Sequence, residues 1–341
     1  MKKMRFLMLV GGLALLACRP GATLAESATV SDDLKNQQTT QRSSQMPTQP
    51  EEVRYQMLRP AQVVARRNAC SIVYIPIGIL EWHGEHNALG ADALQAEGIA
   101  IRAAQLGGGL VFPPLYYGEV RSEALMEAAA PDRNQIAEKM GLPPENFGPD
   151  RIPFSALEQA MNYQRLLLHI LHEAETLGFK VAVLVPGHYP LIDHARSACL
   201  QFNQRSRTRR EDGMLAWACV DFLLVEDAYP QAGDHAAGWE TSHMLALHPN
   251  TVDMSLLPPK GQKLVGVGGK MPPQDATAAF GQETIDAAAR VMVREARHRL
   301  EHDKEYRKHG RTLQEGLWRQ EEAATQKSRN PKSPTSKPAN Q

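Results

Sequence analysis

The sequence predicts an α/β fold in which helices cover both faces of a mostly parallel sheet. Short apolar segments alternate with longer segments of helical periodicity, which is typical of parallel strands joined by crossover helices. The apolar segments are continuous, as expected for strands buried on both faces. We expect strands at 71–77, 110–112, 181–185 and 214–220. We expect helices at 92–105, 156–177, 191–203, 241–247 and 284–300.

The strands are predicted from runs of consecutive apolar residues. In chain order these runs read SIVYIPI, LVF, VAVLV and MLAWACV. The second run is ended by Pro113 and Pro114, which cannot donate to a strand ladder. The helices are predicted from apolar residues at helical spacing, such as Leu94 and Ile101 among alanines. The helix 156–177 has the clearest apolar face, formed by Leu166, Leu167, Ile170 and Leu171.

The chain is expected to hold one folded domain between two polar ends. Residues 1–25 resemble a signal peptide, with a basic start and an apolar run too short to span a bilayer comfortably. Residues 26–52 are rich in Ser, Thr, Gln and Pro and predict a flexible linker. Residues 53–300 are long enough for one well-buried domain. A helical extension at 301–326 and a disordered tail at 327–341 are expected to follow.

Two cleavage sites compete within the N-terminal segment. Leu15-Leu16-Ala17-Cys18 resembles a lipobox, which would make a lipidated Cys18 the mature N-terminus, although Leu16 is unusual at its position. Thr23-Leu24-Ala25 resembles an ordinary signal-peptidase site. Both alternatives predict export to the periplasm or the extracellular space, with or without a membrane anchor.

Charge argues against nucleic-acid binding, and cysteine spacing argues against a cysteine-ligated metal site. The chain has 38 basic and 38 acidic residues, so no nucleic-acid partner is expected. The basic run at 205–210 is interpreted as a solvated helix end. Cys70, Cys199 and Cys219 have no metal-knuckle spacing and are expected to be buried thiols, with one disulfide as the alternative.

A cluster of chemically active residues directly follows the first strand. Glu81, His83, His86 and Asp92 lie within a dozen residues. Holding carboxylates and imidazoles so close together is costly unless a cation binds them, which indicates one or two divalent metal ions.

Later loops add residues of the same kind. His188 follows the third strand, Asp234 and His235 follow the fourth, and Glu240 opens the next helix. Because ligands bind at the carboxyl ends of parallel strands, we expect these loops to converge at one edge of the sheet.

Each of these residues also has a structural interpretation. Asp92 could cap a helix in a capping box with Gln95, and Glu240 could complement a helix N-terminus. His188 could be a core histidine, and His86 could orient a ligand instead of binding metal. Trp82 and Trp239 could line a pocket or pack in the core. His169 and His172, on an apolar helix, are expected to be structural.

Three segments resemble, in order, the motifs of the creatininase (creatinine amidohydrolase) family. The first spans Pro76–Asp92 and carries the pattern E-x-H-G-x-H, the second is Gly187-His188-Tyr189, and the third spans His235–Ser242. The spacings within the first and third segments agree with the family. The resemblance implies a three-layer α/β/α fold, a dinuclear metal centre, hydrolysis of C–N amide bonds and a homo-oligomer, often a hexamer.

The resemblance also implies a set of ligands. By position, Glu81, Asp92 and His188 would hold one divalent metal ion. His83 and Asp92 would hold the other, with Asp92 as the bridge. Zinc, manganese or both are expected, and iron suits the same mixed donors.

The resemblance further implies a catalytic role for His235 and Glu240, which would transfer a proton to the leaving nitrogen. Two dications would lower the pKa of a bridging water to give a hydroxide, and would polarise the substrate carbonyl.

The chain departs from the family in two places. In creatininase itself, a Glu two residues after the second-motif His completes the second metal site, whereas this chain has Pro190, which offers no donor. Glu240 is then the candidate for the missing ligand, and His243 lies on the same helical face and could assist. The segment 116–153 does not resemble the usual substrate loop, which weighs against creatinine as the substrate.

The sequence therefore predicts an exported metal-dependent amidohydrolase for a small amide, lactam or formamide. The alternative is a catalytically inactive metal-binding or solute-binding protein on the same fold. A hydrolase that modifies a cyclic ligand or a peptide is a third interpretation.

Overall fold

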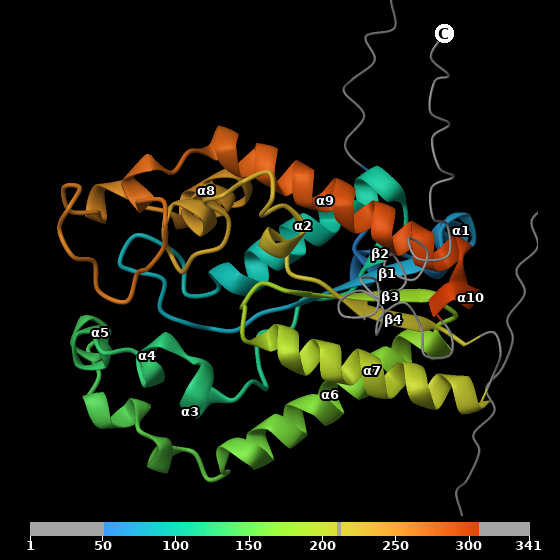
Figure 1. Cartoon of the computed structure of the whole chain (residues 1–341), viewed down its shortest axis with the longest axis horizontal. Helices are drawn as coiled ribbons and strands as arrows, with labels where there is room; N and C mark the ends of the chain where they lie inside the picture. Colours follow the sequence, from blue (N-terminus) through green and yellow to red (C-terminus); the bar gives the residue numbers. More distant parts are fainter. Residues whose placement is uncertain (1–50, 210–212, 307–341) are drawn as a thin grey trace, which may run out of the picture. The chain divides into compact units, whose positions relative to one another are not determined.

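A computed structural model describes residues 51–209 and 213–306 (Figure 1). The predicted signal peptide, Cys18, almost all of the linker and the tail lie outside the described residues, as does most of the expected C-terminal extension. Within the described part of the chain, no helix is both long enough and apolar enough to cross a membrane.

Four parallel strands form the central sheet, in the order β2-β1-β3-β4. Strand β1 (Ile72–Ile77) pairs along its whole length with β3 (Val181–Pro186), and β2 (Leu110–Val111) and β4 (Leu215–Ala218) lie at the two edges. All four strands lie where the apolar runs predict them. The predicted α/β fold with a parallel sheet is therefore confirmed.

Helices cover both faces of this sheet (Figure 1). One face carries α2 (Ala91–Gly107) and α9 (Ala278–Glu301), and α8 (Gly238–Leu247) packs on both of these helices. The other face carries α6 (Ala156–Thr176) and α7 (Leu191–Arg209).

The core is divided into two layers by the sheet. Val73 and Ile75 of β1 belong to the cluster with α6 and α7, whereas Ile72 and Tyr74 belong to the cluster with α2 and α9. This division follows from the alternation of side chains along a strand. Each fully buried aliphatic side chain contributes about 1.5–3 kcal/mol, so both clusters hold the strand ends in place.

Several short elements have no counterpart in the sequence prediction. Helix α1 (Pro60–Ala69), which precedes the sheet, is one of them. Helix α10 (Asp303–Tyr306) follows α9 and lies within the expected helical extension at 301–326. The segment between β2 and α6 contains α3 (Arg121–Ala124), α4 (Met126–Ala129) and α5 (Arg133–Lys139). Short 3-10 helices lie at Tyr55–Met57, Pro144–Phe147, Pro149–Arg151, Phe222–Leu224, Pro249–Thr251, Met254–Leu256 and Pro273–Asp275.

Two helices begin earlier than their periodicity indicates. Helix α8 begins at Gly238 because the Asp234 carboxylate accepts hydrogen bonds from the Trp239 and Glu240 backbone N–H groups. Helix α9 begins at Ala278 because the Thr277 hydroxyl accepts the Phe280 N–H. Thr277 is the N-cap of α9 and stabilises the helix by about 1 kcal/mol, whereas Asp234 bonds the first turn of α8 from three residues before its N-cap, Ala237.

Two glycines bring the start of α2 against the ends of β1 and β3. A Cβ atom on Gly187 would lie 1.9 Å from the Asp92 carbonyl oxygen, and one on Gly78 would lie 2.3 Å from the Ala93 nitrogen. Only glycine allows this close approach. Asp92, in the first turn of α2, is thereby held beside the loops that follow both strands.

The three described cysteines, Cys70, Cys199 and Cys219, are free and buried. The prediction of buried thiols is confirmed for them, and the alternative of a disulfide among them is wrong.

Candidate metal centre

Loops at the carboxyl ends of the strands bring the candidate ligands together. Glu81 and His83 lie in the loop from β1 to α2, Asp92 lies in the first turn of α2, and His188 follows β3. These four residues are at most 6% exposed. His235 lies in the loop before α8, and Glu240 lies in the first turn of that helix. All six predicted residues therefore meet at one edge of the sheet.

Two groups of possible ligands share Asp92. The first group contains Glu81, Asp92 and His188, and the second group contains His83, Asp92 and Glu240. Within each group, one donor atom from each residue lies within 4.8 Å of the others, and every member is buried. A further combination joins Glu81 and His83 to His235.

Each of the three histidines has one ring nitrogen bonded to a backbone carbonyl. His83 uses Nδ1 at 3.0 Å, His188 uses Nε2 at 3.0 Å and His235 uses Nε2 at 2.8 Å. The carbonyls belong to Glu81, Ala124 and Trp82, respectively. Because a carbonyl only accepts, these nitrogens must carry the protons, which leaves the opposite nitrogen of a neutral ring as a free donor of electrons. Histidine metal ligands are fixed in this way.

The opposite nitrogens face carboxylates. His83 Nε2 lies 3.1 Å from Asp92 Oδ1, and His188 Nδ1 lies 3.1 Å from Glu81 Oε2 and 3.4 Å from Asp92 Oδ2. Glu81 Oε2 and Asp92 Oδ2 are nevertheless buried with no aligned hydrogen-bond partner. A ring nitrogen lone pair that faces a carboxylate oxygen needs a cation between the two atoms, either a proton or a metal ion. The buried oxygens without donors and the mixed N/O donor set therefore fit divalent metal ions.

Electrostatics within the cluster favour positive charge. Burial alone would lower the pKa of His188, but its close contacts with the Asp92 and Glu81 carboxylates raise it to about 10. Burial opposes protonation of His83 too, yet the Asp92 charge holds its pKa well above the usual value. Burial would raise the pKa of Asp92, and the charge of His83 lowers it. Protons and divalent cations thus compete for the same positions.

Glu240 reaches the second group from α8. Its Oε2 lies 3.4 Å from His83 Nε2 and accepts the Ala236 N–H at 2.7 Å, and its Oε1 accepts from Gln95 Nε2 at 3.2 Å. Ala236 has a left-handed backbone with φ of 54°, a conformation that costs about 1–3 kcal/mol and is found at functional sites. Pro190 lines the cavity beside these residues without contributing a donor.

Asp92 is not a helix cap. The N-cap of α2 is Gly90, and the Asp92 carboxylate contacts His83 and His188. Gln95 donates to Glu240 and makes no capping box. The capping interpretation is therefore wrong, because Asp92 lies two residues past the N-cap and its carboxylate faces the histidines instead of the backbone N–H groups.

Two other histidines lie next to the ligand groups without belonging to them. His86 Nε2 bonds the Thr241 hydroxyl at 3.0 Å, and burial lowers its pKa to about 4. His243 contacts Gln95 Oε1 at 3.3 Å and Thr284 Oγ1 at 2.9 Å. Neither belongs to a ligand group found among the described residues.

The two tryptophans differ in role. Trp239 lines the cavity and donates its Nε1–H to Asp221 at 3.1 Å. Trp82 is buried beside the cavity and donates to the Val265 carbonyl.

Two buried acids at the site were missed from the sequence. Asp221 lies just beyond β4, where burial raises its pKa to about 6. The position of Asp221 just after a strand could have identified it from the sequence. Glu127 of α4 accepts the Trp82 backbone N–H at 2.7 Å, and its neighbour Met126 donates its backbone N–H to Glu81 Oε1 at 2.5 Å. No motif or periodicity marks Glu127, because only tertiary contacts bring α4 to the site.

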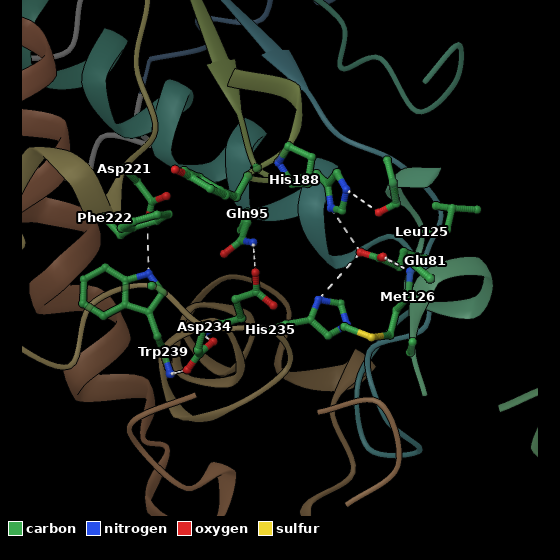
Figure 2. Close-up of a pocket in the computed structure, with 18 residues that line it drawn as sticks. Glu81, Gln95, Leu125, Met126, His188, Asp221, Phe222, Asp234, His235 and Trp239 are labelled. Carbon is green, nitrogen blue, oxygen red and sulfur yellow. Dashed lines mark hydrogen bonds and ion pairs between the residues drawn. The ribbon is translucent and has the colours of Figure 1, made fainter. Parts of the chain in front are cut away.

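A cavity of about 430 Å³ opens onto these residues. Figure 2 shows Glu81, His188 and His235 on one side of it, with Asp221, Phe222 and Trp239 on the other. Leu125, Met126, Ala129 and Ala130 form an apolar wall from the segment of α3 and α4. Within the described parts of the chain, no Lys or Arg lines it.

Comparison with known proteins gives concordant matches. The family model described as creatininase, creatinine amidohydrolase, matches residues 56–296. The creatinine amidohydrolase of Pseudomonas putida is 25% identical over 197 residues, which are 54% of this chain and 66% of that protein. The match thus spans slightly less than two thirds of this relative.

Solved structures of creatininases have the same fold. A creatininase variant of the Zn-Zn type has a TM-score of 0.54 with 20% identity, covering 74% of this chain and 98% of its own. A manganese creatininase has a TM-score of 0.53 with 20% identity, covering 74% of this chain and 99% of its own.

Proposed function

The chain belongs to the creatininase family, and from this premise we propose that it is a metal-dependent amidohydrolase that cleaves a C–N bond of a small amide, lactam or formamide. The observation that carries the proposal is the shared position of Asp92 between two buried ligand groups. The names of the relatives, a creatinine amidohydrolase and creatininases of zinc and manganese types, point to the same chemistry.

In this proposal, Glu81 and His188 of the first group would hold one divalent ion, and His83 and Glu240 of the second group would hold another. Asp92 belongs to both groups and would contribute to both sites. Zinc and manganese suit the mixed imidazole and carboxylate donors, as does iron. When bound, such a pair of ions lowers the pKa of water and polarises a carbonyl, which makes amide hydrolysis accessible near neutral pH.

His235 is the proposed proton carrier. Its Nε2–H is fixed on the Trp82 carbonyl, so in the neutral ring Nδ1 is free to accept a proton and later release it to the leaving nitrogen. Nδ1 lies 3.6 Å from Glu81 Oε2, directly at the first group. The other candidate for proton transfer, Glu240, has both carboxylate oxygens engaged by donors. We therefore assign Glu240 as a ligand and His235 as the catalytic residue.

The cavity supports a compact, uncharged or cationic substrate. A volume of about 430 Å³ with an apolar wall suits a small amide. None of the described residues that line this cavity is a Lys or Arg that could neutralise an anionic group. The wall comes from the segment that does not resemble the family's substrate loop, so we propose the substrate class without assigning creatinine.

The alternative function is a catalytically inactive metal-binding or solute-binding protein. Pro190 favours this alternative, because a ligand of the second metal ion is lost there. Glu240 argues against it, since its carboxylate lies 3.4 Å from His83 Nε2.

Location and assembly are also proposals. The N-terminal sequence supports export to the periplasm or extracellular space, with a lipid anchor at Cys18 as one alternative and cleavage after Ala25 as the other. The family resemblance supports a homo-oligomer, often a hexamer. Mass spectrometry of the mature N-terminus would separate the two cleavage sites.

The decisive experiment combines metal analysis with a substrate screen. Metal-reconstituted protein should bind about two divalent ions per chain and hydrolyse at least one member of a panel of amides, lactams and formamides. Glu81→Gln should abolish turnover. Only trace metal in carefully loaded protein would overturn the dinuclear centre. Full loading without turnover across the panel would establish the inactive binding protein instead.

A further inference from the structure

A chain of buried polar side chains leads from Glu240 away from the cavity. Gln95 of α2 donates its Nε2–H to Glu240 Oε1 at 3.2 Å, and its Oε1 lies 3.3 Å from His243 Nδ1 in α8. His243 Nε2 lies 2.9 Å from the Thr284 hydroxyl in α9. Figure 2 shows Gln95 reaching the cavity between the two sides. Three helices thus meet through one hydrogen-bonded chain.

The side chains of this hydrogen-bonded series are almost completely buried. Gln95 is 2% exposed, and His243 and Thr284 are 0% exposed. A buried polar group without a partner is destabilising, so each member must pair with the next. Such a network specifies one arrangement of its members more strongly than exposed contacts could.

The direction of every hydrogen bond follows from the Glu240 carboxylate. A carboxylate ligand only accepts, so Gln95 must present its NH₂ group to it. The Gln95 carbonyl then faces His243, which must carry its proton on Nδ1. His243 Nε2 is left to accept the hydroxyl proton of Thr284, which the Phe280 carbonyl at 2.9 Å would otherwise accept.

The surroundings of His243 keep the ring neutral, as this order of donors requires. Burial lowers the pKa of His243 to about 4, although the charge of Glu240 opposes the change. Among the described residues, the other acid that faces it is Asp221, whose Oδ2 is 3.8 Å from Nδ1 and already accepts from Trp239. The Trp239 ring packs against the imidazole, with centroids 4.9 Å apart.

We infer that Gln95 and His243 are positioning residues that hold Glu240 as a ligand of the second metal ion, compensating for the donor absent at Pro190. Gln95 fixes Glu240 Oε1, which turns Oε2 toward His83. His243 fixes the orientation of the Gln95 amide. The inference rests on the proposed function, because it presupposes that the second group binds metal.

The test measures metal affinity on protein stripped of metal and titrated with Zn²⁺ against a competing chelator. Wild type should bind two ions, and Gln95→Met, which keeps the length of the side chain and removes its donor, should bind one of them about 10- to 100-fold more weakly. The other ion should bind as in wild type. Wild type that binds no second ion would refute the proposed function. Wild type that binds two, with Gln95→Met unchanged, would refute only this inference.

Two substitutions at His243 test the orientation step. His243→Asn keeps an amide N–H near the position of Nδ1, whereas His243→Leu removes the donor. Asn should retain most of the second-ion affinity that Leu loses. Equal loss in both variants would overturn the role of His243, and if Gln95→Met does not fold, this pair still decides the question.

A matched control separates positioning from stability. Asn203 of α7 is likewise an amide with two hydrogen bonds, to the Ala216 backbone, but it lies on the opposite face of the sheet. Asn203→Leu should lower the melting temperature and leave both zinc affinities unchanged. A loss of second-ion affinity in this control equal to that in Gln95→Met would show a general structural effect and overturn the inference.

Discussion

The two halves of the candidate metal centre are held in different ways. In the first group, backbone atoms hold the ligands, since the Met126 N–H bonds Glu81 and the Ala124 carbonyl accepts from His188. In the second group, backbone atoms also contact His83 and Glu240 Oε2, but Glu240 Oε1 is held by the side chain of Gln95. Backbone contacts survive most substitutions, whereas side-chain contacts depend on residue identity. The second group, where the chain departs from the family at Pro190, is therefore the half that sequence change can remodel.

The strongest test of this comparison removes the residue common to both halves. Asp92→Ala should eliminate both ions and lower any amidase activity by at least about 10³-fold, because several kcal/mol of transition-state stabilisation would be lost. Elemental analysis together with circular dichroism would check the result. Retention of one ion at full occupancy would show that Asp92 is not the bridge.

The next test separates the two halves. Glu240→Gln should lower the affinity for one ion by at least about 100-fold and leave the ion of the first group in place. This loss is larger than the usual cost of removing an outer hydrogen-bond partner of a ligand. Adding Pro190→Glu to this variant should restore part of the affinity, because a carboxylate would return to the position that creatininase uses. Zinc titrations of the single and double variants would measure both effects. A first-group ion that is lost together with the second would mean that the halves are not separable.

A third test uses pH. The pKa of His188 in the folded, metal-free protein is about 10, above the unfolded value of about 6.5. The stabilisation that its proton provides is therefore complete below about pH 6.5 and is lost as the pH rises toward 10. The melting temperature of stripped protein should fall through this range, and zinc-loaded protein should be less affected because the metal replaces the proton. Thermal melts of both forms at several pH values would check this.

His188→Gln provides the control for the pH test, because it removes the titrating group. The melting temperature of the stripped form should fall with rising pH in wild type and stay flatter in this variant. An identical pH dependence in both proteins would show that His188 does not cause the effect.

The same contrast explains what could be predicted from the sequence. The four strands and the helices α2 and α6 follow from apolar periodicity, and Glu81 and His188 are marked by their places after strands. Helices α3 to α5 lack such a pattern, because they are held in place by tertiary contacts. One example is the hydrogen bond that the Glu127 carboxylate accepts from the Trp82 backbone N–H. The roles proposed for Gln95 and His243 were equally hidden, since a hydrogen-bonded chain across three helices leaves no local signal.

The smallest expected effect concerns the wall of the cavity. The Met126 backbone N–H bonds Glu81, but its side chain lines the cavity. Met126→Ala should therefore raise KM by about 3- to 10-fold through lost apolar contact, while leaving metal content and kcat nearly unchanged. Steady-state kinetics with the best substrate from the screen would measure both constants. A large fall in kcat or in metal content would mean that the side chain, and not only the backbone, supports the first group, and the contrast between the two halves would weaken accordingly.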